Sequence, residues 1–348
     1  MKKAEVFLRN IVIYLLKLIS RKSRKPVKSP DSKSKILIIR LNNIGDALVT
    51  TPLIKIIKKY TDAEIKVVAG KRNYFIFENN KNISDILLYD KSVKGFFRLL
   101  KQINSSDFDY IIDTHTDTSS TVSLLAAFTK APYKVCLQKN TSSLYNIVTP
   151  YDAESEIHII EKVCRIAEAL GISYTEDDIQ MEYNFLSKSE DKAKYFIKNY
   201  CSGNGKIIGI NFFAGSSARF WGTDKFIKLI DYLDSKDFRL VPISDTNNFE
   251  LAKQICPVQK IFCGSFDELA ALVSGLDYLI TPDTSLVHLC SIYKIPAFIF
   301  FVKYRLSGSL WTPYKTYYES VITEESTLKN ISFDEALIKI KKFLNIND

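Results

Sequence analysis

The sequence contains few of the residues that hold metal ions or cross-link a chain. Its three histidines lie far apart and show no metal-ligand spacing. Its six cysteines include no C-x-x-C pair, and a chain of 348 residues can bury a core without disulfides. We therefore expect reduced thiols, a cytosolic protein and no metal site.

Two nucleotide-binding loops are also missing. The sequence has neither the G-x-G-x-x-G loop of dehydrogenases nor the G-x-x-x-x-G-K-[ST] loop of P-loop kinases, so we exclude both classes. It also lacks the ~20 consecutive apolar residues that a membrane-spanning helix needs. The apolar run near the front is interrupted by Arg9, Asn10 and Lys17.

The excess of positive charge is confined to the front of the chain. The net charge is +9, and residues 1–35 alone hold eleven Lys or Arg against two Asp or Glu, which already gives +9. The remaining 37 basic and 37 acidic residues cancel. A neutral body gives little support to a nucleic-acid-binding face, so we expect no nucleic-acid partner.

The front segment is both apolar and basic. The apolar clusters Val6–Leu8 and Ile11–Leu16 precede the basic stretch Arg21–Lys25. This pattern is typical of a helix lying on an anionic membrane surface, here through residues 1–25. The alternative is a solubilising tail whose apolar residues pack on the body. We treat residues 1–34 as this segment with its linker, because Pro, Ser and Lys dominate the last part.

From Lys35 onward, strand patterns alternate with helix patterns, which predicts the α/β class with parallel sheets. A turn-rich break near Cys201–Gly205 divides the body into two Rossmann-like domains, 35–190 and 205–325, followed by a C-terminal helix within 326–348. The expected strands are 36–41, 64–69, 85–88, 110–113 and 134–137 in the first series and 207–212, 239–243, 260–262, 278–281 and 296–301 in the second. A helix is expected at 47–60, with a restart at Thr51-Pro52.

Two strand–loop–helix segments carry polar residues where the chain leaves a sheet. In the first series, Leu41–Asp46 places a carboxylate after the opening strand. In the second, Pro282 leads into a short helix that Asp283 or Thr284 can cap. Free N–H groups and the helix dipole at such a start bind phosphate. A base in one series and an anion site in the other indicate transfer chemistry on a phosphorylated donor. Because ligands bind beyond the carboxyl ends of such strands, we expect the loops to face each other across a cleft.

Four segments, taken in order, resemble glycosyltransferase family 9, the heptosyltransferases of lipopolysaccharide core assembly. The first is the strand and loop at 36–46, ending in Ile-Gly-Asp, and the second is Glu-Ile-His at 156–158, which leads a helix to Leu-Gly-Ile at 170–172. The third is Ala-Gly-Ser-Ser-Ala-Arg-Phe-Trp at 214–221, and the fourth runs from Glu-Leu-Ala-Ala-Leu at 268–272 through 277–289, which contains Thr-Pro-Asp-Thr-Ser-Leu-Val-His. The resemblance covers residues 35–325 and implies the GT-B fold, two Rossmann-like domains facing across a cleft. It also implies inversion of the sugar's anomeric centre without a metal. The chain departs from the family at Ser285, where Gly is common, at Arg219, where Lys is frequent, and at Phe300–Lys303, all near the expected nucleotide pocket.

The resemblance makes Asp46 the expected general base, which takes a proton from the acceptor hydroxyl as that hydroxyl attacks the anomeric carbon. From the residues alone, Asp46 serves equally well as a cap for a helix beginning at Ala47. Asn43 and Gly45 would shape the loop, Gly45 through a backbone conformation open only to glycine.

In the rear domain, the backbone N–H groups of Thr284, Ser285 and Leu286 are expected to bind the donor diphosphate and stabilise the charge of the leaving group. Arg219 would pair with the phosphates, since a guanidinium binds phosphate bidentately. The same loop contributes Ser216, Ser217 and the loop-shaping Gly215.

Asp283 repels phosphate, so it is expected to fix its loop or to accept from a sugar hydroxyl. His288 lies one turn beyond Thr284 and either donates to phosphate or packs as a helix histidine. For His158, which opens an amphipathic helix, a structural role is favoured.

Asp113, His115 and Asp117 follow a strand of the front domain, a position that suits contacts with the acceptor. A solvated loop without function is the slightly favoured alternative. Asp107 and Asp109 mimic a metal-binding Asp-x-Asp motif, but their place before a buried strand predicts a turn.

Together these features predict a glycosyltransferase on the inner face of the cytoplasmic membrane. It would move a sugar, expected to be heptose from ADP-heptose, onto the lipopolysaccharide core or another lipid-linked saccharide. The expected partners are the nucleotide-sugar, that acceptor and the anionic membrane, with no cofactor. Two alternatives stay open: a nucleotide-sugar 2-epimerase of the same architecture, and a non-catalytic nucleotide-sugar-binding protein at the membrane.

Overall fold

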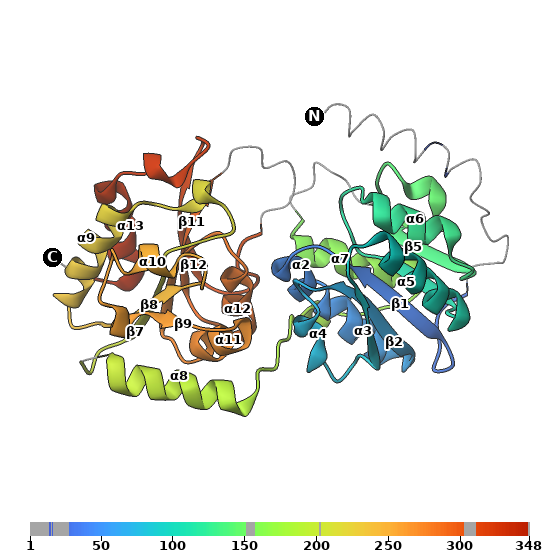
Figure 1. Ribbon diagram of the computed structural model, residues 1–348, viewed down its shortest axis with the longest axis horizontal. Helices are drawn as coiled ribbons and strands as arrows, with labels where there is room; N and C mark the ends of the chain where they lie inside the picture. Colours follow the sequence, from blue (N-terminus) through green and yellow to red (C-terminus); the bar gives the residue numbers. More distant parts are fainter. Residues whose placement is uncertain are drawn as a thin grey trace. The chain divides into compact units, whose positions relative to one another are not determined.

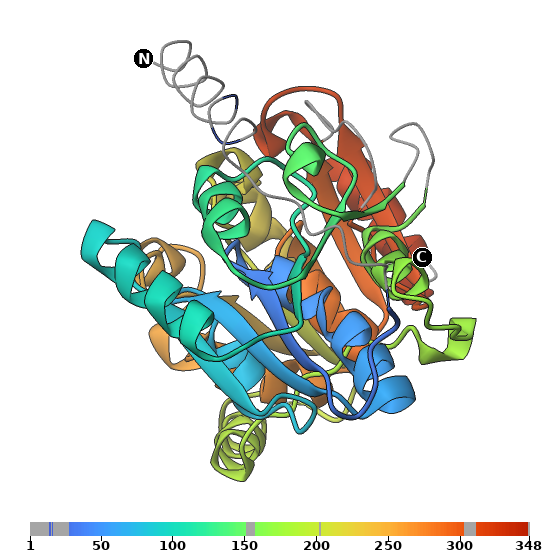
Figure 2. The same cartoon turned by 90° about the vertical axis from the view of Figure 1, so that its right-hand side faces the viewer.

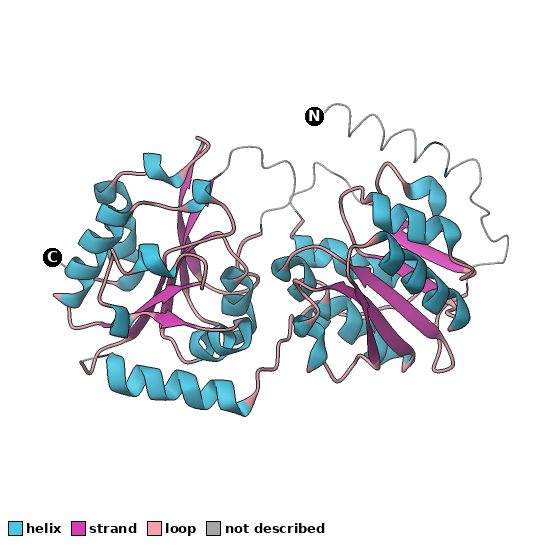
Figure 3. Cartoon of the chain, in the orientation of Figure 1, coloured by secondary structure: helices cyan, strands magenta, loops and turns pink. Residues whose placement is uncertain are grey.

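The computed structural model describes Tyr14, Leu16 and residues 28–150, 157–201, 203–302 and 311–346. The chain divides into two compact units, Met1–Glu182 and Tyr183–Asp348 (Figure 1). Each unit contains a parallel sheet with helices against it (Figure 3), so the predicted α/β class is confirmed. No helix in the described pieces combines the length and the apolar character that crossing a membrane requires.

The predicted membrane-surface segment, residues 1–25, lies outside the described residues apart from Tyr14 and Leu16. Leu16 is buried in an apolar cluster with Ala126 and Tyr145, whereas Tyr14 is exposed. Burial of Leu16 is what the alternative prediction, a segment packed on the body, implies for that residue.

The sheet of the first unit has the strand order β3-β2-β1-β4-β5-β6, with every neighbouring pair parallel. Its strands are β1 (Lys35–Arg40), β2 (Glu64–Gly70), β3 (Asp85–Tyr89), β4 (Tyr110–Asp113), β5 (Tyr133–Leu137) and β6 (Ile147–Thr149). The order reverses between β1 and β4, because the chain builds outward from β1 to β3 and then returns. Loops that leave such a reversal point bind ligands in Rossmann-like sheets.

Helices of the first unit begin at local signals. They are α2 (Ile44–Leu48), α3 (Thr51–Thr61), α4 (Phe75–Glu78), α5 (Val93–Ser105), α6 (Ser120–Phe128) and α7 (Ile159–Ala169), with short 3-10 turns η1 (Ser142–Leu144) and η2 (Glu176–Asp178). The restart predicted at Thr51-Pro52 is confirmed, because proline in a first turn loses no helical hydrogen bond. The α5 helix begins where Ser92 Oγ accepts the Gly95 N–H at 2.8 Å.

The sheet of the second unit has the order β12-β11-β10-β7-β8-β9, again all parallel. Its strands are β7 (Ile207–Asn211), β8 (Arg239–Ser244), β9 (Phe262–Cys263), β10 (Tyr278–Pro282), β11 (Ala297–Val302) and β12 (Tyr318–Thr323). Counted from β7, this is the topology of the first unit, with its reversal between β7 and β10. The strand expected at 260–262 is wrong in position, because a 3-10 turn ends at Lys260 and β9 begins at Phe262.

The helices of the second unit are α8 (Ser187–Tyr200), α9 (Thr223–Asp234), α10 (Phe249–Ala252), α11 (Phe266–Ser274), α12 (Leu286–Tyr293) and α13 (Phe333–Leu344), with 3-10 turns η3 (Ser217–Arg219), η4 (Val258–Lys260) and η5 (Leu328–Asn330). The α8 helix joins this unit through Ser189, whose hydroxyl donates to Asp267 of α11 at 2.5 Å. The α13 helix buries Ile340 and Phe343 in the same core as Trp221. The C-terminal helix is therefore part of the second unit.

Candidate functional site

Predicted site residues lie at both reversal points. In the first unit, Asp46 follows β1 and Asp113 ends β4, the strand that pairs with β1. In the second unit, Arg219 follows β7 and Asp283 follows β10, which pairs with β7. The same topological position thus carries charged side chains in each unit, where ligands of parallel sheets bind.

The Asp46 carboxylate is held by one partner on each oxygen. Oδ1 lies 3.3 Å from Arg40 Nη1, and Oδ2 accepts the backbone N–H of Asn43 at 3.2 Å. Asn43 is the N-cap of α2, and the bond from its N–H to Asp46 is one arm of a capping box. The predicted capping role of Asp46 is therefore confirmed, but for a helix that begins at Ile44 and not at Ala47. The Asp46 side chain is 15% exposed. Because a carboxylate offers about four acceptor positions, Asp46 is fixed and still able to accept from a ligand hydroxyl.

Arg40 is the buried cation behind this carboxylate. Its side chain is 1% exposed, and Nε donates to Thr50 Oγ1 at 2.8 Å. Asn73 Nδ2 donates to the Arg40 carbonyl at 3.0 Å. Burial lowers the pKa of the guanidinium, and the charges of Asp46 and Asp113 oppose that shift. A buried charge needs a partner, so Arg40 and Asp46 depend on each other.

A second buried ion pair lies at the end of β4. Asp113 Oδ2 accepts from Lys139 Nζ at 2.8 Å and from the Tyr145 hydroxyl at 2.5 Å. Its Oδ1 lies 2.8 Å from His115 Nδ1. Burial acts to raise the pKa of Asp113, but Lys139 and His115 together hold it below its ordinary value.

His115 connects this pair to the loop after β1. Its Nε2 accepts the Leu41 N–H at 3.2 Å, so Nδ1 carries the ring proton and donates to Asp113. Asp113 and His115 are 1% and 0% exposed, so the predicted solvated loop is wrong at these positions. The physical reason is that Lys139 and Tyr145 satisfy the polar atoms from across the fold. Asp117 is the exposed member of the set.

In the second unit, Arg219 binds the loop after β10 through Asp283. Its Nη1 donates to the Asp283 carbonyl at 2.8 Å, and its Nη2 lies 3.1 Å from Asp283 Oδ2. The Arg219 side chain is 40% exposed, and these bonds use two of its five N–H donors. Burial raises the pKa of Asp283, and Arg219 opposes that shift. Asp283 therefore fixes its loop, one of the two roles expected for it.

The start of α12 offers donors to an anion. Ser285 is the N-cap, not Asp283 or Thr284, and Thr284 Oγ1 accepts the Leu286 N–H at 3.1 Å. The Leu286 N–H, predicted to bind diphosphate, is thus engaged by Thr284. Among the described residues, the N–H groups of Thr284 and Ser285 donate to no other residue. Two amides at the positive end of a helix dipole suit a phosphate.

The two predicted loop glycines have different outcomes. Gly45 lies inside α2 and is not among the described glycines with positive φ, so a conformation open only to glycine is wrong there. The helix begins at Ile44, three residues earlier than the predicted start at Ala47. At Gly215, an added Cβ would meet nothing within 4 Å. Ser216 and Ser217 beside it are exposed, and Ser216 Oγ accepts the Ala218 N–H at 3.3 Å.

The two helix histidines have structural contacts. His288 is 3% exposed, and its ring centroid lies 5.6 Å from that of Trp311. His158 is the N-cap of α7, and its Nδ1 accepts the Ile160 N–H at 3.2 Å, so its predicted structural role is confirmed. The turn predicted around Asp107 and Asp109 is confirmed at Asp107, whose φ is 48°, and Asp109 accepts the N–H of Lys35 at 2.9 Å. The described residues contain no group of three His, Cys, Asp or Glu placed to hold a metal.

Comparison with known proteins identifies the family. The family model for glycosyltransferase family 9 (heptosyltransferase) matches residues 96–328, about two thirds of the chain. The chain belongs to glycosyltransferase family 9. Lipopolysaccharide heptosyltransferase 3 of Escherichia coli (strain K12) is 26% identical over 286 residues, 74% of this chain and 79% of that protein.

Solved structures agree in fold with this family 9 chain. A glycosyl transferase family 9 protein from Veillonella parvula DSM 2008 has a TM-score of 0.74 at 18% identity, covering 92% of this chain and 99% of its own. E. coli ADP-heptose lps heptosyltransferase II has a TM-score of 0.70 at 16% identity, covering 89% and 98%. The chain is therefore a glycosyltransferase of the predicted GT-B fold. The family match begins beyond the loop that holds Asp46, whose role stays a proposal.

Arg40, Thr50, Lys139 and Tyr145 were not predicted as parts of the site. Arg40 ends an otherwise apolar buried strand, a signal that it needs a charged partner nearby. Lys139 carries no comparable signal, because it lies on a polar stretch and its partner is 26 residues earlier.

Proposed function

We propose that this family 9 chain is an inverting, metal-independent heptosyltransferase. It would move heptose from ADP-heptose onto the lipopolysaccharide core or another lipid-linked saccharide. The names of its relatives support this substrate class: one is a lipopolysaccharide heptosyltransferase, and one solved structure is named an ADP-heptose lps heptosyltransferase. A nucleotide-sugar is then a substrate, and no resident cofactor is required.

The observation that carries the proposal is the geometry of Asp46. Its carboxylate is oriented by Arg40 and by the Asn43 N–H, yet part of it reaches solvent. In the proposed reaction, the acceptor hydroxyl oxygen attacks the anomeric carbon while its proton passes to Asp46. The bond from that carbon to the ADP oxygen breaks, and its electron pair leaves with ADP. A single displacement of this kind inverts the anomeric centre.

The second unit would hold the leaving group. The N–H groups of Thr284 and Ser285 and the guanidinium of Arg219 supply the positive charge that a growing phosphate anion needs. Ser216 and Ser217, exposed on the η3 turn, are proposed to add hydrogen bonds to the same phosphates. Asp117 is proposed to contact the acceptor, because it is the exposed residue on the loop after β4.

A lipid-linked acceptor places the enzyme at a membrane. We propose that the chain works on the cytoplasmic face of the inner membrane and that residues 1–25 contact its anionic surface. The excess positive charge of that segment supports electrostatic attachment.

The proposal is tested by Asp46→Asn in an assay of ADP release from ADP-heptose with purified acceptor. Loss of a general base is expected to lower kcat/KM by about 10²- to 10⁴-fold. Donor binding should persist, and ADP-heptose at 100 times its Kd should still stabilise the variant by about 2.7 kcal/mol. Asp62→Asn is the matched control, because Asp62 is an exposed carboxylate of the same unit.

Full activity in Asp46→Asn would overturn the assignment of the base. Transfer that stops after EDTA and returns with a divalent ion would overturn metal independence. The anomeric proton coupling of the product reports whether the donor's configuration is inverted. Release of free sugar from ADP-heptose without acceptor, at the rate seen with acceptor, would overturn transfer itself.

A further inference from the structure

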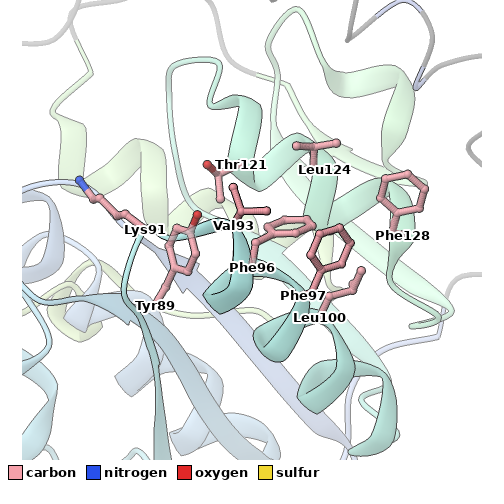
Figure 4. A pocket seen from close by; sticks show the side chains of 9 residues that line it. All are labelled: Tyr89, Lys91, Val93, Phe96, Phe97, Leu100, Thr121, Leu124 and Phe128. Carbon is pink, nitrogen blue, oxygen red and sulfur yellow. The ribbon is translucent and has the colours of Figure 1, made fainter.

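An apolar cavity of about 490 Å³ opens on the surface of the first unit between α5 and α6. Figure 4 shows Val93, Phe96 and Phe97 in a row between Tyr89 and Phe128. Leu100 of α5 and Leu124 of α6 complete its apolar wall. Figures 1 and 2 both show α5 and α6 side by side at the periphery of the sheet. The bond from Asn104 Nδ2 to the Phe128 carbonyl, at 3.2 Å, joins the two helices.

Exposed residues that line this cavity are unusually apolar for a solvated surface. Val93 is 77% exposed, Phe97 is 63% exposed and Phe128 is 46% exposed. Each lines the cavity, so they form one patch and not scattered single residues. An exposed contiguous apolar patch of this kind marks a surface that meets another apolar body.

The charge around the patch is predominantly positive. Residues 91–106 and 118–150 contain no Asp or Glu. Lys91, Lys94, Lys101 and Lys130 are all exposed there. On α5, the cations at positions 94, 98 and 101 form a stripe one residue beyond the apolar stripe at 93, 97 and 100.

Acidic residues near this face reduce the positive excess, and one of them, Asp117, is exposed just before α6. Arg98 forms an ion pair with Asp90 at 2.7 Å, so these two charges cancel each other. Asp107 follows the C-terminal end of α5 and is exposed. The patch therefore keeps a net positive rim although the body of the protein is neutral overall.

We propose that the α5–α6 face, meaning the cavity with its rim of Lys91, Lys94, Lys101 and Lys130, docks on an anionic phospholipid bilayer. Phe97 and Phe128 enter between the lipid headgroups, the cavity receives apolar lipid segments, and the lysines meet the headgroup phosphates. Charge complementarity selects this partner. The cavity has few polar groups with which to bind nucleobases or a polar protein surface. Leu16 of the front segment packs with Ala126 of α6, so the experiment below varies the front segment and the α5–α6 face independently. The contact does not depend on the transfer reaction.

The test uses the full chain in sedimentation with phosphatidylcholine vesicles that contain or lack phosphatidylglycerol. Phe97→Ser is expected to weaken binding to anionic vesicles by about tenfold or more, the effect of exposing one buried aromatic side chain. K94Q/K101Q is expected to weaken binding by about 25-fold, or about fivefold per charge. Each variant is also measured in an R21Q/K22Q/R24Q/K25Q background, which weakens the front segment and leaves the α5–α6 face intact.

Matched controls lie on α8 of the other unit. Tyr195 is 62% exposed, so Tyr195→Ser removes an equally exposed aromatic ring. K188Q/K198Q removes the same net charge as K94Q/K101Q. Both controls are expected to bind as the parent chain does. Circular dichroism confirms that each variant is folded.

Three results would overturn the proposal. The first is unchanged binding by both Phe97→Ser and K94Q/K101Q in either background. The second is a dimer in sedimentation velocity that Phe97→Ser dissociates, which would assign the face to a second copy. The third is binding of single-stranded RNA by the parent chain that Phe97→Ser and K94Q/K101Q abolish.

Discussion

Burial of Asp283 disfavours the ionised form of its carboxyl group. Burial raises its pKa, and Arg219 offsets that shift only in part. The pKa of this carboxyl is higher in the folded state than in the unfolded state, where it is about 3.9. The ionised carboxylate therefore lowers the free energy of unfolding at neutral pH. The protein tolerates this at a loop proposed to bind the donor.

Asp283→Asn is therefore expected to stabilise the second unit at pH 7 while raising the KM for donor. The gain should be on the order of 1 kcal/mol, as for other single stabilising substitutions, and should vanish as the pH falls through about 4, where Asp283 is protonated in both states. Both tryptophans, Trp221 and Trp311, lie in this unit, so tryptophan fluorescence in urea isolates its unfolding. A less stable Asp283→Asn at pH 7 would mean that the Arg219 pair outweighs burial.

Asp113 behaves in the opposite sense. Burial acts to raise its pKa, but Lys139 and His115 together lower it below the ordinary value. A carboxyl with a lowered folded pKa contributes stability above its unfolded pKa and loses that contribution as the pH falls through the folded one. The first unit should therefore lose stability from about pH 4 downward.

Asp113→Asn tests this at one residue. It leaves Lys139 buried without its carboxylate, which is expected to cost about 3–5 kcal/mol at pH 7. The difference between wild type and variant should shrink below about pH 4, in the range where the wild-type carboxyl begins to protonate. Far-UV circular dichroism in urea, corrected for the second unit by tryptophan fluorescence, measures it. Asp62→Asn, at an exposed carboxylate, is the control, and an equal loss of stability there would contradict the buried-pair explanation.

At the scale of elements, helix starts that depend on contacts within a few residues could be predicted from the sequence. The restart of α3 at Thr51-Pro52 and the capping box of Ser265 and Glu268 at α11 depend on contacts inside one turn. Central strands were also predicted, because burial on both faces leaves an unbroken apolar run. Of the edge strands, β3 was predicted, but β6 and β12 were missed and β9 was misplaced. An edge strand is paired on one side only, and β12, with exposed Ile322, lacks an apolar run.

The buried polar cluster is the part of the site that local sequence could not predict. The stretch Asp113–Asp117 is polar enough to indicate a solvated loop. Its burial depends on Lys139 and Tyr145, which the fold brings in from two elements later. Arg40 was more readable, because a charge that ends an apolar strand needs a partner. Asp46 then lies within reach on the next turn.

The start of α12 joins local stability to proposed donor binding. Thr284 Oγ1 accepts the Leu286 N–H, so Thr284→Val should cost about 1 kcal/mol, the usual effect of a lost helix cap. It should also raise the KM for ADP-heptose, whereas Thr284→Ser should preserve both properties. Ser332→Ala is the matched control, because Ser332 Oγ caps α13 by accepting the Glu335 N–H at 3.2 Å. If Ser332→Ala raises the KM for donor equally, stability alone explains the effect of Thr284→Val.

At the scale of the whole molecule, the two units repeat one topology with different chemistry. Each places its charged residues at the reversal of strand order, where two loops leave neighbouring strands. In the first unit, both cations are buried and paired, Arg40 with Asp46 and Lys139 with Asp113. In the second, Arg219 is also paired, with Asp283, but its side chain is 40% exposed, and the nearby N–H groups of Thr284 and Ser285 donate to no described residue. A fixed carboxylate suits proton transfer, and an exposed cation suits phosphate.

This division predicts that nucleotide binding belongs to one unit. Each unit has its own sheet and core, so residues 183–348 should fold when expressed alone, as independent domains do. That fragment should bind ADP with a Kd within about tenfold of the full chain, an energy difference of about 1.4 kcal/mol or less. It should catalyse no transfer, because it lacks Asp46. Calorimetric titration with ADP measures the affinity, and Arg219→Met in the fragment is expected to weaken it. A folded fragment that binds no ADP, while residues 1–182 do, would reverse the proposed roles of the two units.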